Sequence, residues 1–187
     1  MNSKLSHGWC FLADRDATYD FGFKLGQLLG EDEHKNLPRV IAAFGNLGAG
    51  KTSLAQGLAR GIGVPRSTYV NSPTFAIHQA HQAELYHHLT YFHHLDLYRL
   101  EDEEELIHLG FEELLESGLT YIEWPQRAPS LFIGIKHLQV HLYHLDEWKS
   151  GEFTDQEDGR VIELRGSLEI MRCLSPVLSL SIVEKAN

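Results

Sequence analysis

The chain has 187 residues, 43% of them hydrophobic, which is enough to bury one substantial core. Its formal net charge of −10 and pI near 5.6 work against tight, non-specific binding to a nucleic-acid backbone, because such binding depends on Lys and Arg neutralising phosphates. Only Cys10 and Cys173 are present, without a C-x-x-C pair, so the sequence supports neither a disulfide framework nor a four-thiolate zinc site.

The distribution of apolar residues indicates a protein that does not enter membranes. No apolar run approaches the length needed to span a bilayer, and the N-terminal residues lack the apolar core of a signal peptide. There is also no repeat of fixed period and no low-complexity linker. We therefore expect a soluble, cytoplasmic protein whose residues 1–187 form a single domain with a C-terminal β extension and a tail.

The N-terminal part predicts a strand followed by a helix. Residues 8–12 suit a short edge strand, and residues 16–29 suit a helix with Asp16 as its N-cap. The apolar side chains of this helix form a stripe, namely Tyr19, Phe23, Leu25 and Leu29. Packing beside the sheet is the favoured role of this helix, and a wall of an adenine pocket is the alternative.

Residues 40–44 form an apolar run that predicts a buried strand, and the run stops at Gly45. The next eight residues, GNLGAGKT, match the motif G-x-x-x-x-G-K-[ST] at every position. The following SLAQGLARGI has the apolar spacing of a helix. Strand, glycine loop and helix thus come in the order that a phosphate-binding loop requires.

The composition of this loop suits a polyanion. Glycines lack a Cβ, so the backbone adopts positive φ and its N–H groups converge on phosphate oxygens beside a helix N-terminus. Lys51 is predicted to reach the β- and γ-phosphates of ATP, and the Thr52 hydroxyl to ligate Mg²⁺. The predicted ATP-binding residues are Gly45, Asn46, Leu47, Gly48, Ala49, Gly50, Lys51, Thr52, Ser53 and Thr74.

The segment Val70-Asn71-Ser72-Pro73-Thr74-Phe75 follows the loop helix. In phosphate-loop proteins, a Ser- and Thr-bearing segment at this place folds over the γ-phosphate and responds to hydrolysis by a change in order. The same residues suit an ordinary Ser-Pro turn, which the local sequence by itself favours.

The next stretch is rich in histidine, with His78, His81, His87, His88, His93 and His94. This crowding raises the hypothesis of a zinc site, since neutral imidazole is a common zinc ligand. Adjacent histidines on a strand point to opposite faces, however, and no thiolate supports the site. Histidines that face solvent or a partner are therefore the favoured interpretation.

Two carboxylates stand at the ends of predicted strands. Residues 91–95 suit a strand that ends at Asp96, and residues 119–122 suit a buried strand that ends at Glu123. Ligand sites of α/β sheets lie at the carboxyl ends of strands. Asp96 and Glu123 are therefore predicted to hold Mg²⁺, directly or through water, and to orient the attacking water.

The remaining segments predict helices and strands but contain no predicted site residue. Residues 101–117 suit a helix with an acidic, solvated start. From Ile133 onward the pattern alternates, at Leu138, Val140 and Leu142 and again at residues 161–164, which predicts antiparallel strands added to the main sheet. The last segment suits a packing helix and a tail. The predicted class is an α/β phosphate-loop NTPase with a mostly parallel central sheet, flanking helices and antiparallel C-terminal strands.

Taken together, these motifs resemble the TsaE family, also called YjeE, of small bacterial ATPases needed to make threonylcarbamoyladenosine in tRNA. The resemblance covers roughly residues 17–127. It is carried by GNLGAGKTSLAQGLARGIG, by NSPTFAI, by LDLYRL with an acidic helix and LGFEE after it, and by YIEWPQR.

The resemblance implies a phosphate-loop fold, Mg-ATP hydrolysis to ADP and phosphate, and a cytoplasmic complex with the proteins TsaB and TsaD. By matching position, Lys51 and Thr52 are the phosphate and Mg²⁺ residues, and residues 72–74 are the switch. Asp96 and Glu123 match the two functional acids of the family. Whether the protein itself touches tRNA stays open at this stage.

The resulting hypothesis is an ATPase in which Lys51, Asp96 and Glu123 are catalytic, Thr52, Asp96 and Glu123 hold the metal, and loss of the γ-phosphate releases the switch. Two alternatives stay open. A small-molecule kinase shares the loop but must also hold a phosphoryl acceptor, and a non-hydrolysing scaffold needs ATP binding without turnover.

Overall fold

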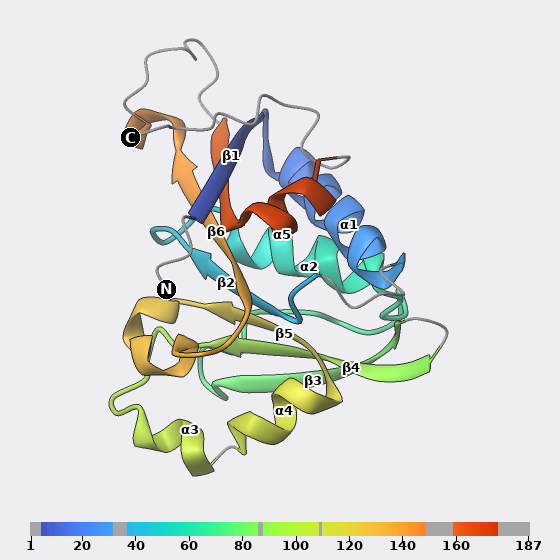
Figure 1. Cartoon of the computed structure of the whole chain (residues 1–187), viewed down its shortest axis with the longest axis vertical. Helices are drawn as coiled ribbons and strands as arrows, with labels where there is room; N and C mark the ends of the chain where they lie inside the picture. Colours follow the sequence, from blue (N-terminus) through green and yellow to red (C-terminus); the bar gives the residue numbers. More distant parts are fainter. Residues whose placement is uncertain (1–4, 32–36, 86–87, 109, 149–158, 176–187) are drawn as a thin grey trace.

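The computed structural model describes residues 5–31, 37–85, 88–108, 110–148 and 159–175, which form a central sheet with helices on both faces (Figure 1). The strands are β1 (Leu5–Leu12), β2 (Val40–Phe44), β3 (His78–Leu85), β4 (His88–Asp96), β5 (Gly118–Glu123), β6 (His137–His144) and β7 (Arg160–Ser167). The helices are α1 (Arg15–Glu31), α2 (Lys51–Gly61), α3 (Glu104–His108), α4 (Phe111–Ser117) and α5 (Leu168–Cys173). Short 3-10 turns are η1 (Pro125–Arg127), η2 (Pro129–Phe132) and η3 (Leu145–Glu147).

The seven strands form one sheet in the order β1-β7-β6-β2-β5-β4-β3. Strands β6, β2, β5 and β4 are parallel to one another, whereas β1, β7 and β3 pair antiparallel at the two edges. The predicted α/β class is therefore confirmed, whereas the sheet, predicted to be mostly parallel, is mixed: its centre is parallel and both of its edges are antiparallel.

The prediction of antiparallel C-terminal strands is correct for β7 and wrong for β6. Strand β6 lies parallel to β2, with Ala43 opposite Val140. The alternation of Leu138, Val140 and Leu142 reports that one face of β6 is buried, but alternation carries no information on strand direction. The direction follows from the turns η1 and η2, which carry the chain back across the sheet before β6 begins (Figure 1).

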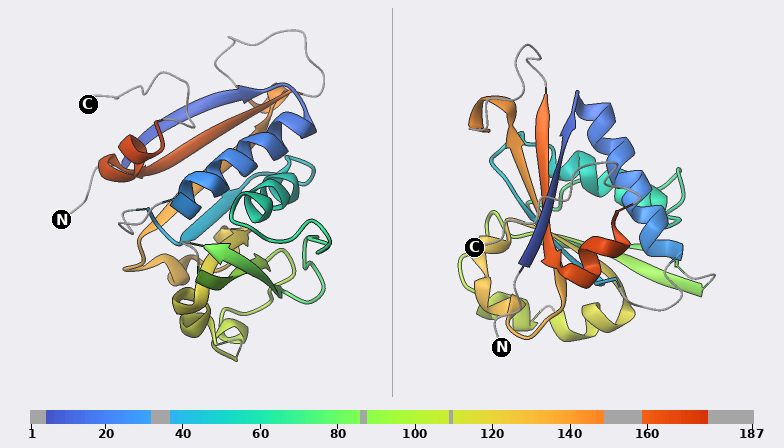
Figure 2. Two further views of the ribbon diagram at one scale, coloured as in Figure 1. Left: turned by 90° about the vertical axis from the view of Figure 1, so that its right-hand side faces the viewer. Right: turned by 45° about the horizontal axis from the view of Figure 1, so that its top comes forward.

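Helices α1 and α2 cover one face of the sheet and pack closely on each other (Figure 2). Their contact is made by glycines, because a Cβ on Gly57 would lie 2.0 Å from the carbonyl oxygen of Tyr19. A Cβ on Gly22 would likewise lie 2.4 Å from the carbonyl oxygen of Leu54. The backbones thus touch directly, and this contact fixes α2, whose N-terminus borders the candidate site.

Helix α1 has the predicted position but a different cap. It begins at Arg15, and the Asp14 carboxylate accepts a hydrogen bond of 2.8 Å from the Ala17 amide. Asp16 lies within the first turn, where its charge suits the helix dipole. The buried residues also differ from the predicted stripe, since Phe21 is buried whereas Tyr19 and Phe23 are only partly buried.

The opposite face of the sheet is covered by α3, α4 and the turns that follow β5. Leu95 and Ile122 of the strands pack there with Leu106 and Phe111 of the helices. Residues 101–117 were predicted as one helix, but Gly110, with φ of 64°, separates α3 from α4. Both faces of β5 are buried, as expected for a central parallel strand.

Two further observations concern the predictions on membranes and the tail. Within the described ranges, none of the helices has the length and apolar character to cross a membrane. The predicted packing helix near the C-terminus is α5, with Ile170 and Met171 buried, and residues 176–187 lie outside the described part of the chain.

Candidate functional site

The glycine loop lies between β2 and α2 and has the backbone conformation that its sequence predicts. Gly45 has φ of 144°, and a Cβ there would lie 2.5 Å from the carbonyl oxygen of Leu142. Gly50 has φ of 101° and directly precedes α2. Because L side chains rarely adopt such φ values, the loop turns tightly only with glycine at these positions. The amides at the N-terminus of α2 therefore face the space above the strands.

Lys51 is a buried cation beside this loop, only 4% exposed. Its Nζ donates hydrogen bonds of 2.7 Å and 2.8 Å to the carbonyl oxygens of Gly45 and Asn46. Burial lowers the pKa of Lys51 below its usual 10.5, while the charges of Glu123 and Asp96 act to raise it. Within the part of the chain that the structure describes, no carboxylate forms an ion pair with Lys51. The ammonium group thus has neutral acceptors only and suits an added anion.

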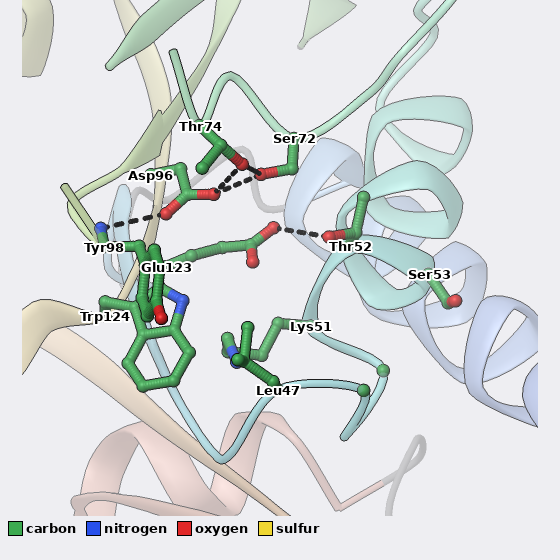
Figure 3. Close-up of a pocket in the computed structure, with 12 residues that line it drawn as sticks. Leu47, Lys51, Thr52, Ser53, Ser72, Thr74, Asp96, Tyr98, Glu123 and Trp124 are labelled. Atoms are coloured by element: carbon green, nitrogen blue, oxygen red, sulfur yellow. Dashed lines mark hydrogen bonds between the residues drawn. The ribbon is translucent and has the colours of Figure 1, made fainter.

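The two predicted acids meet at this loop. Asp96 lies opposite Glu123 in the register of β4 and β5, and each side chain is 3% exposed. Glu123 accepts a hydrogen bond of 3.0 Å from the Thr52 hydroxyl, which joins the acid to the first turn of α2 (Figure 3). The residues enclose a cavity of about 320 Å³. Its lining comprises Leu47, Gly48, Gly50, Lys51, Thr52, Ser53, Ser72, Thr74, Asp96, Tyr98, Glu123 and Trp124.

Asp96 is bonded to the segment that was predicted as a switch. Its Oδ2 accepts hydrogen bonds from the Ser72 hydroxyl and, at 2.8 Å, from the Thr74 hydroxyl. Its Oδ1 accepts a hydrogen bond of 3.0 Å from the Tyr98 amide. Residues 72–74 therefore form more than a Ser-Pro turn, because both hydroxyl side chains fasten the segment to an acid of the site (Figure 3).

Aromatic rings close the other side of the cavity. Lys51 Nζ lies 4.0 Å from the centre of the Trp124 ring, and Tyr98 packs against the same ring at 5.0 Å between centroids. Trp124 has a positive φ of 59°, a strained conformation for a bulky residue that often marks a functional site. The ring of Trp124 is thereby directed over the ammonium group.

The other predicted loop residues differ in their surroundings. Ala49 is buried against the core, whereas Leu47 is 66% exposed at the rim of the cavity. The Asn46 side chain donates a hydrogen bond of 2.5 Å to Glu147, and the Ser53 hydroxyl accepts one of 3.3 Å from Arg15. The loop tip and α2 are thus each tied to a distant segment.

The interpretation of the histidine-rich stretch as facing solvent or a partner is wrong for His81, His93 and His94. His93 is 3% exposed and His94 is fully buried, and His81 is 9% exposed. His93 bonds to His78 at 3.0 Å on one face of β4, and His94 lies on the other face. Among the residues described here, no group of three or more His, Cys, Asp or Glu is arranged to hold a metal ion. His87 lies outside those residues.

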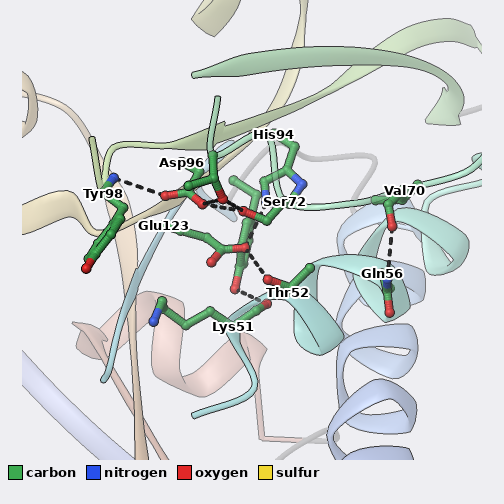
Figure 4. A network of polar contacts seen from close by, with 11 residues as sticks. Lys51, Thr52, Gln56, Val70, Ser72, His94, Asp96, Tyr98 and Glu123 are labelled. Carbon is green, nitrogen blue, oxygen red and sulfur yellow. Dashed lines mark hydrogen bonds and ion pairs between the residues drawn. The ribbon is translucent and has the colours of Figure 1, made fainter. Parts of the chain in front are cut away.

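Two polar residues of the site were missed in the sequence. His94 Nε2 lies 2.9 Å from Glu123 Oε1 (Figure 4). The Tyr121 hydroxyl donates a hydrogen bond of 2.8 Å to the Lys51 carbonyl oxygen. Burial and the nearby charges of Glu123 and Asp96 raise the pKa of Tyr121 well above 10, so the hydroxyl stays a donor. The period of two along a strand was the available signal, because His94 shares a face with Asp96 and Tyr121 with Glu123.

The residues of the cavity fit a bound phosphate chain and Mg²⁺. Mg²⁺ keeps several waters and takes one or two protein oxygens together with phosphate oxygens. Thr52, Asp96 and Glu123 offer a hydroxyl and two carboxylates at one end of the cavity, and Lys51 lies beside them. The donor set therefore suits a metal shared with a phosphate.

Comparison with known families decides which group the chain belongs to. The family model described as "Threonylcarbamoyl adenosine biosynthesis protein TsaE" matches residues 12–152, the greater part of the chain. The chain belongs to the TsaE family. The matched range holds every residue of the cavity, so the site lies within the part that TsaE proteins share.

Individual TsaE proteins are also similar to this chain over much of its length. A tRNA threonylcarbamoyladenosine biosynthesis protein TsaE from Synechocystis is 40% identical over 129 residues, which cover 65% of this chain and 72% of the relative. The TsaE protein of Nostoc is 37% identical over 127 residues, which cover 64% of this chain and 68% of the relative. That of Bacillus subtilis is 38% identical over 104 residues, covering 50% and 61%.

A solved structure extends the likeness beyond this part. The crystal structure of YdiB from Bacillus subtilis superposes with a TM-score of 0.63 at 20% identity, covering 94% of this chain and 96% of YdiB. At that identity the match shows the fold alone. It supports the mixed α/β sheet described above, including the antiparallel edge that lies outside the TsaE family match.

Proposed function

We propose that the chain is a Mg²⁺-dependent ATPase that acts in the formation of threonylcarbamoyladenosine in tRNA. The observation that carries the proposal is the convergence of Lys51, Thr52, Asp96 and Glu123 on one cavity of about 320 Å³. These side chains come from α2, β4 and β5, which are far apart in sequence, and chance seldom brings such a set together beside a phosphate loop. Membership of the TsaE family supports the biological process.

In this proposal each residue has one task. The loop amides and Lys51 bind the β- and γ-phosphates, and the Lys51 ammonium stabilises the charge that develops on the transferred phosphoryl group. Thr52, with Asp96, would hold Mg²⁺, which neutralises phosphate charge when bound. Glu123 lies at the same end of the cavity, where its carboxylate would orient the attacking water and accept its proton.

The switch would couple this chemistry to partners. Residues 72–74 are held to Asp96, and the next residue, Phe75, is 85% exposed. Hydrolysis that disturbs Asp96 would release the segment and move an exposed aromatic side chain. The expected partners are the TsaB and TsaD proteins, whose working cycle the ATPase would drive. A direct contact with tRNA is not part of the proposal.

Single-turnover hydrolysis of Mg-ATP, with and without TsaB and TsaD, tests the proposal. Lys51→Ala is expected to abolish phosphate-dependent nucleotide binding, and Glu123→Ala to keep the nucleotide and lose turnover. Equal turnover by wild type and Glu123→Ala, with partners present, would reject the role of Glu123. A phosphorylated product that requires an acceptor would indicate a kinase, and ATP-dependent partner binding without turnover would indicate a scaffold.

A further inference from the structure

Glu123 is held by a buried histidine as well as by Thr52. His94 is fully buried in β4, two residues before Asp96, and its Nε2 lies 2.9 Å from Glu123 Oε1. The Thr52 hydroxyl donates to the same oxygen at 3.0 Å. Both hydrogen bonds thus end on one oxygen of the carboxylate (Figure 4).

The surroundings of His94 define which proton it carries. Its Nδ1 is buried and has no hydrogen-bond partner among the described residues. A proton on Nδ1 would leave a buried donor unsatisfied, which is unfavourable. A proton on Nε2 instead gives an N–H group that the Glu123 carboxylate can accept, so we assign His94 Nε2 as the donor to Glu123.

The packing around His94 gives this donor a fixed direction. The ring contacts Tyr121 edge-on, with 5.5 Å between centroids, and lies 6.1 Å from the Phe92 ring. In the sheet register His94 is opposite Tyr121, so Glu123 is its diagonal neighbour on β5. Aromatic neighbours in a buried layer leave the imidazole little room to turn.

The consequence falls on the second oxygen of Glu123. Because Oε1 takes both donors, the plane of the carboxylate is fixed and Oε2 points into the cavity (Figure 3). Thr52 has a further task in the proposed function, whereas Glu123 is the only acid that His94 contacts among the residues that the structure describes. His94 is therefore the donor dedicated to the orientation of this carboxylate.

We propose that His94 is a positioning residue for ATP hydrolysis, which directs Glu123 Oε2 toward the attacking water without touching the nucleotide. The inference rests on the proposed function, since it assigns a task only if Glu123 acts in turnover. Loss of a dedicated supporting hydrogen bond at an active site typically lowers activity about 10- to 100-fold.

The test compares variants of His94 with a matched histidine. His94→Phe keeps a buried ring without a donor, and His94→Gln keeps an N–H donor near the place of Nε2. His81→Phe is the control, because His81 is also buried and stacks on Phe92 at 6.3 Å but does not contact Glu123. The readouts are the single-turnover rate with Mg-ATP, the dissociation constant of the nucleotide and a crystal structure of His94→Phe.

The expected result is a fall of about 10- to 100-fold in the rate of His94→Phe with nucleotide affinity within about 2-fold of wild type. His94→Gln should recover most of the rate, and His81→Phe should equal wild type. In the Glu123→Gln background, His94→Phe should cause no further loss, since the two side chains act as one unit. In the crystal structure, the Glu123 carboxylate should turn away from its wild-type direction.

Several outcomes would overturn the inference. One is that the Glu123 carboxylate keeps its direction, or hydrolysis keeps its rate, in His94→Phe. Others are that His94→Phe and His81→Phe lose equal activity, or that His94→Gln recovers none of the rate. A wild-type protein that lacks turnover with its partners present would instead reject the proposed ATPase and, with it, any hydrolytic task of His94. An active wild type with an active His94→Phe rejects the positioning role alone.

Discussion

The two acids of the site are equivalent in the sheet and different in their contacts. Asp96 and Glu123 lie opposite each other at the ends of β4 and β5, and both side chains are 3% exposed. The side-chain donors to Asp96, Ser72 and Thr74, come from a connecting segment, whereas the donors to Glu123 come from α2 and from buried β4. Asp96 is thus tied to a connecting segment, and Glu123 to a helix and a buried strand.

This contrast suggests a different task for each acid, although both are carboxylates and their residue types alone do not distinguish them. A carboxylate held by a helix and a buried strand keeps one orientation, which suits a group that must direct water. A carboxylate held by loop hydroxyls senses whether that loop is closed, which suits a switch. Substitutions at the two acids and at the residues that support them test this division.

Removing the charge of each acid gives the largest effect. Glu123→Gln should lower single-turnover hydrolysis about 10²- to 10⁴-fold, because the amide accepts no proton, while the nucleotide still binds. Asp96→Asn should also impair turnover, but it additionally weakens the acceptor for Ser72 and Thr74. Hydrogen exchange of residues 70–77 should therefore rise in Asp96→Asn and stay at the wild-type level in Glu123→Gln. Equal exchange in the two variants would remove the distinction between the acids.

The helix that supports Glu123 depends on the close contact between α1 and α2. A Cβ on Gly57 would lie 2.0 Å from the carbonyl oxygen of Tyr19 and 2.9 Å from the amide nitrogen of Phe23. Gly57→Ala should force the helices apart and lower the free energy of unfolding by about 3 kcal/mol. The measurement is the midpoint of chemical denaturation at unchanged slope.

Gly134→Ala is the matched control for this prediction. Gly134 has φ of +79° but no heavy atom within 4 Å of the built Cβ. Its substitution should cost only the backbone strain of an L-residue, about 1 kcal/mol. A loss for Gly57→Ala no larger than that of the control would show that the helix contact tolerates a methyl group.

Much of this arrangement was predictable because it is encoded locally. The motif at residues 45–52 specifies a strand, a turn and a helix in sequence, and the two acids directly follow apolar runs. The carboxyl ends of parallel strands meet at one edge of a sheet, so the position of Asp96 and Glu123 beside Lys51 follows from these signals. Their positions in the cavity were thus predicted, while their catalytic and metal-binding roles stay proposals.

The rest was not predictable because it depends on distant partners. The direction of β6 is set by the turns before it. The cap of α1 depends on which aspartate, Asp14 or Asp16, accepts a hydrogen bond from a free amide of the first turn. The histidines were judged as a group, although His93 and His94 point to opposite faces of β4 and have different neighbours. His94 differs from the other histidines in sharing a face of β4 with Asp96. This can be recognised in the sequence only if the strand is placed correctly.

His93 offers a test on the side of β4 away from the cavity. Burial, with the nearby His78, lowers the pKa of His93 to about 4, and its ring bonds to His78 and to Ser117 at 2.8 Å. The unfolded chain, with a histidine pKa near 6.5, therefore binds more protons between about pH 4 and 6.5, so stability falls as pH falls through this window. Its contribution to the free energy of unfolding reaches about 3 kcal/mol across the window.

His93→Gln removes this titration and keeps hydrogen-bonding groups. The variant should show a flatter dependence of unfolding free energy on pH between about 4 and 6.5, measured by denaturation at several pH values. Its single-turnover rate at neutral pH should match wild type, because His93 does not face the cavity. A fall in turnover without a change in the pH dependence of the unfolding free energy would contradict this prediction, because it would give His93 a role in the site.

The smallest effect is expected from a single hydroxyl of the switch. Thr74→Val keeps the shape of the side chain and removes one of the donors to Asp96, while Ser72 and the Tyr98 amide remain. A hydrogen bond of this kind contributes about 0.5–1.5 kcal/mol, so local opening of residues 70–77 should become about 2- to 13-fold more frequent. Hydrogen exchange measures this directly, and global stability should change little. Thr68→Val, in the same connection but without contact to Asp96, should leave the exchange unchanged; faster exchange in both variants would mean that the loop, and not its bond to the acid, sets the opening.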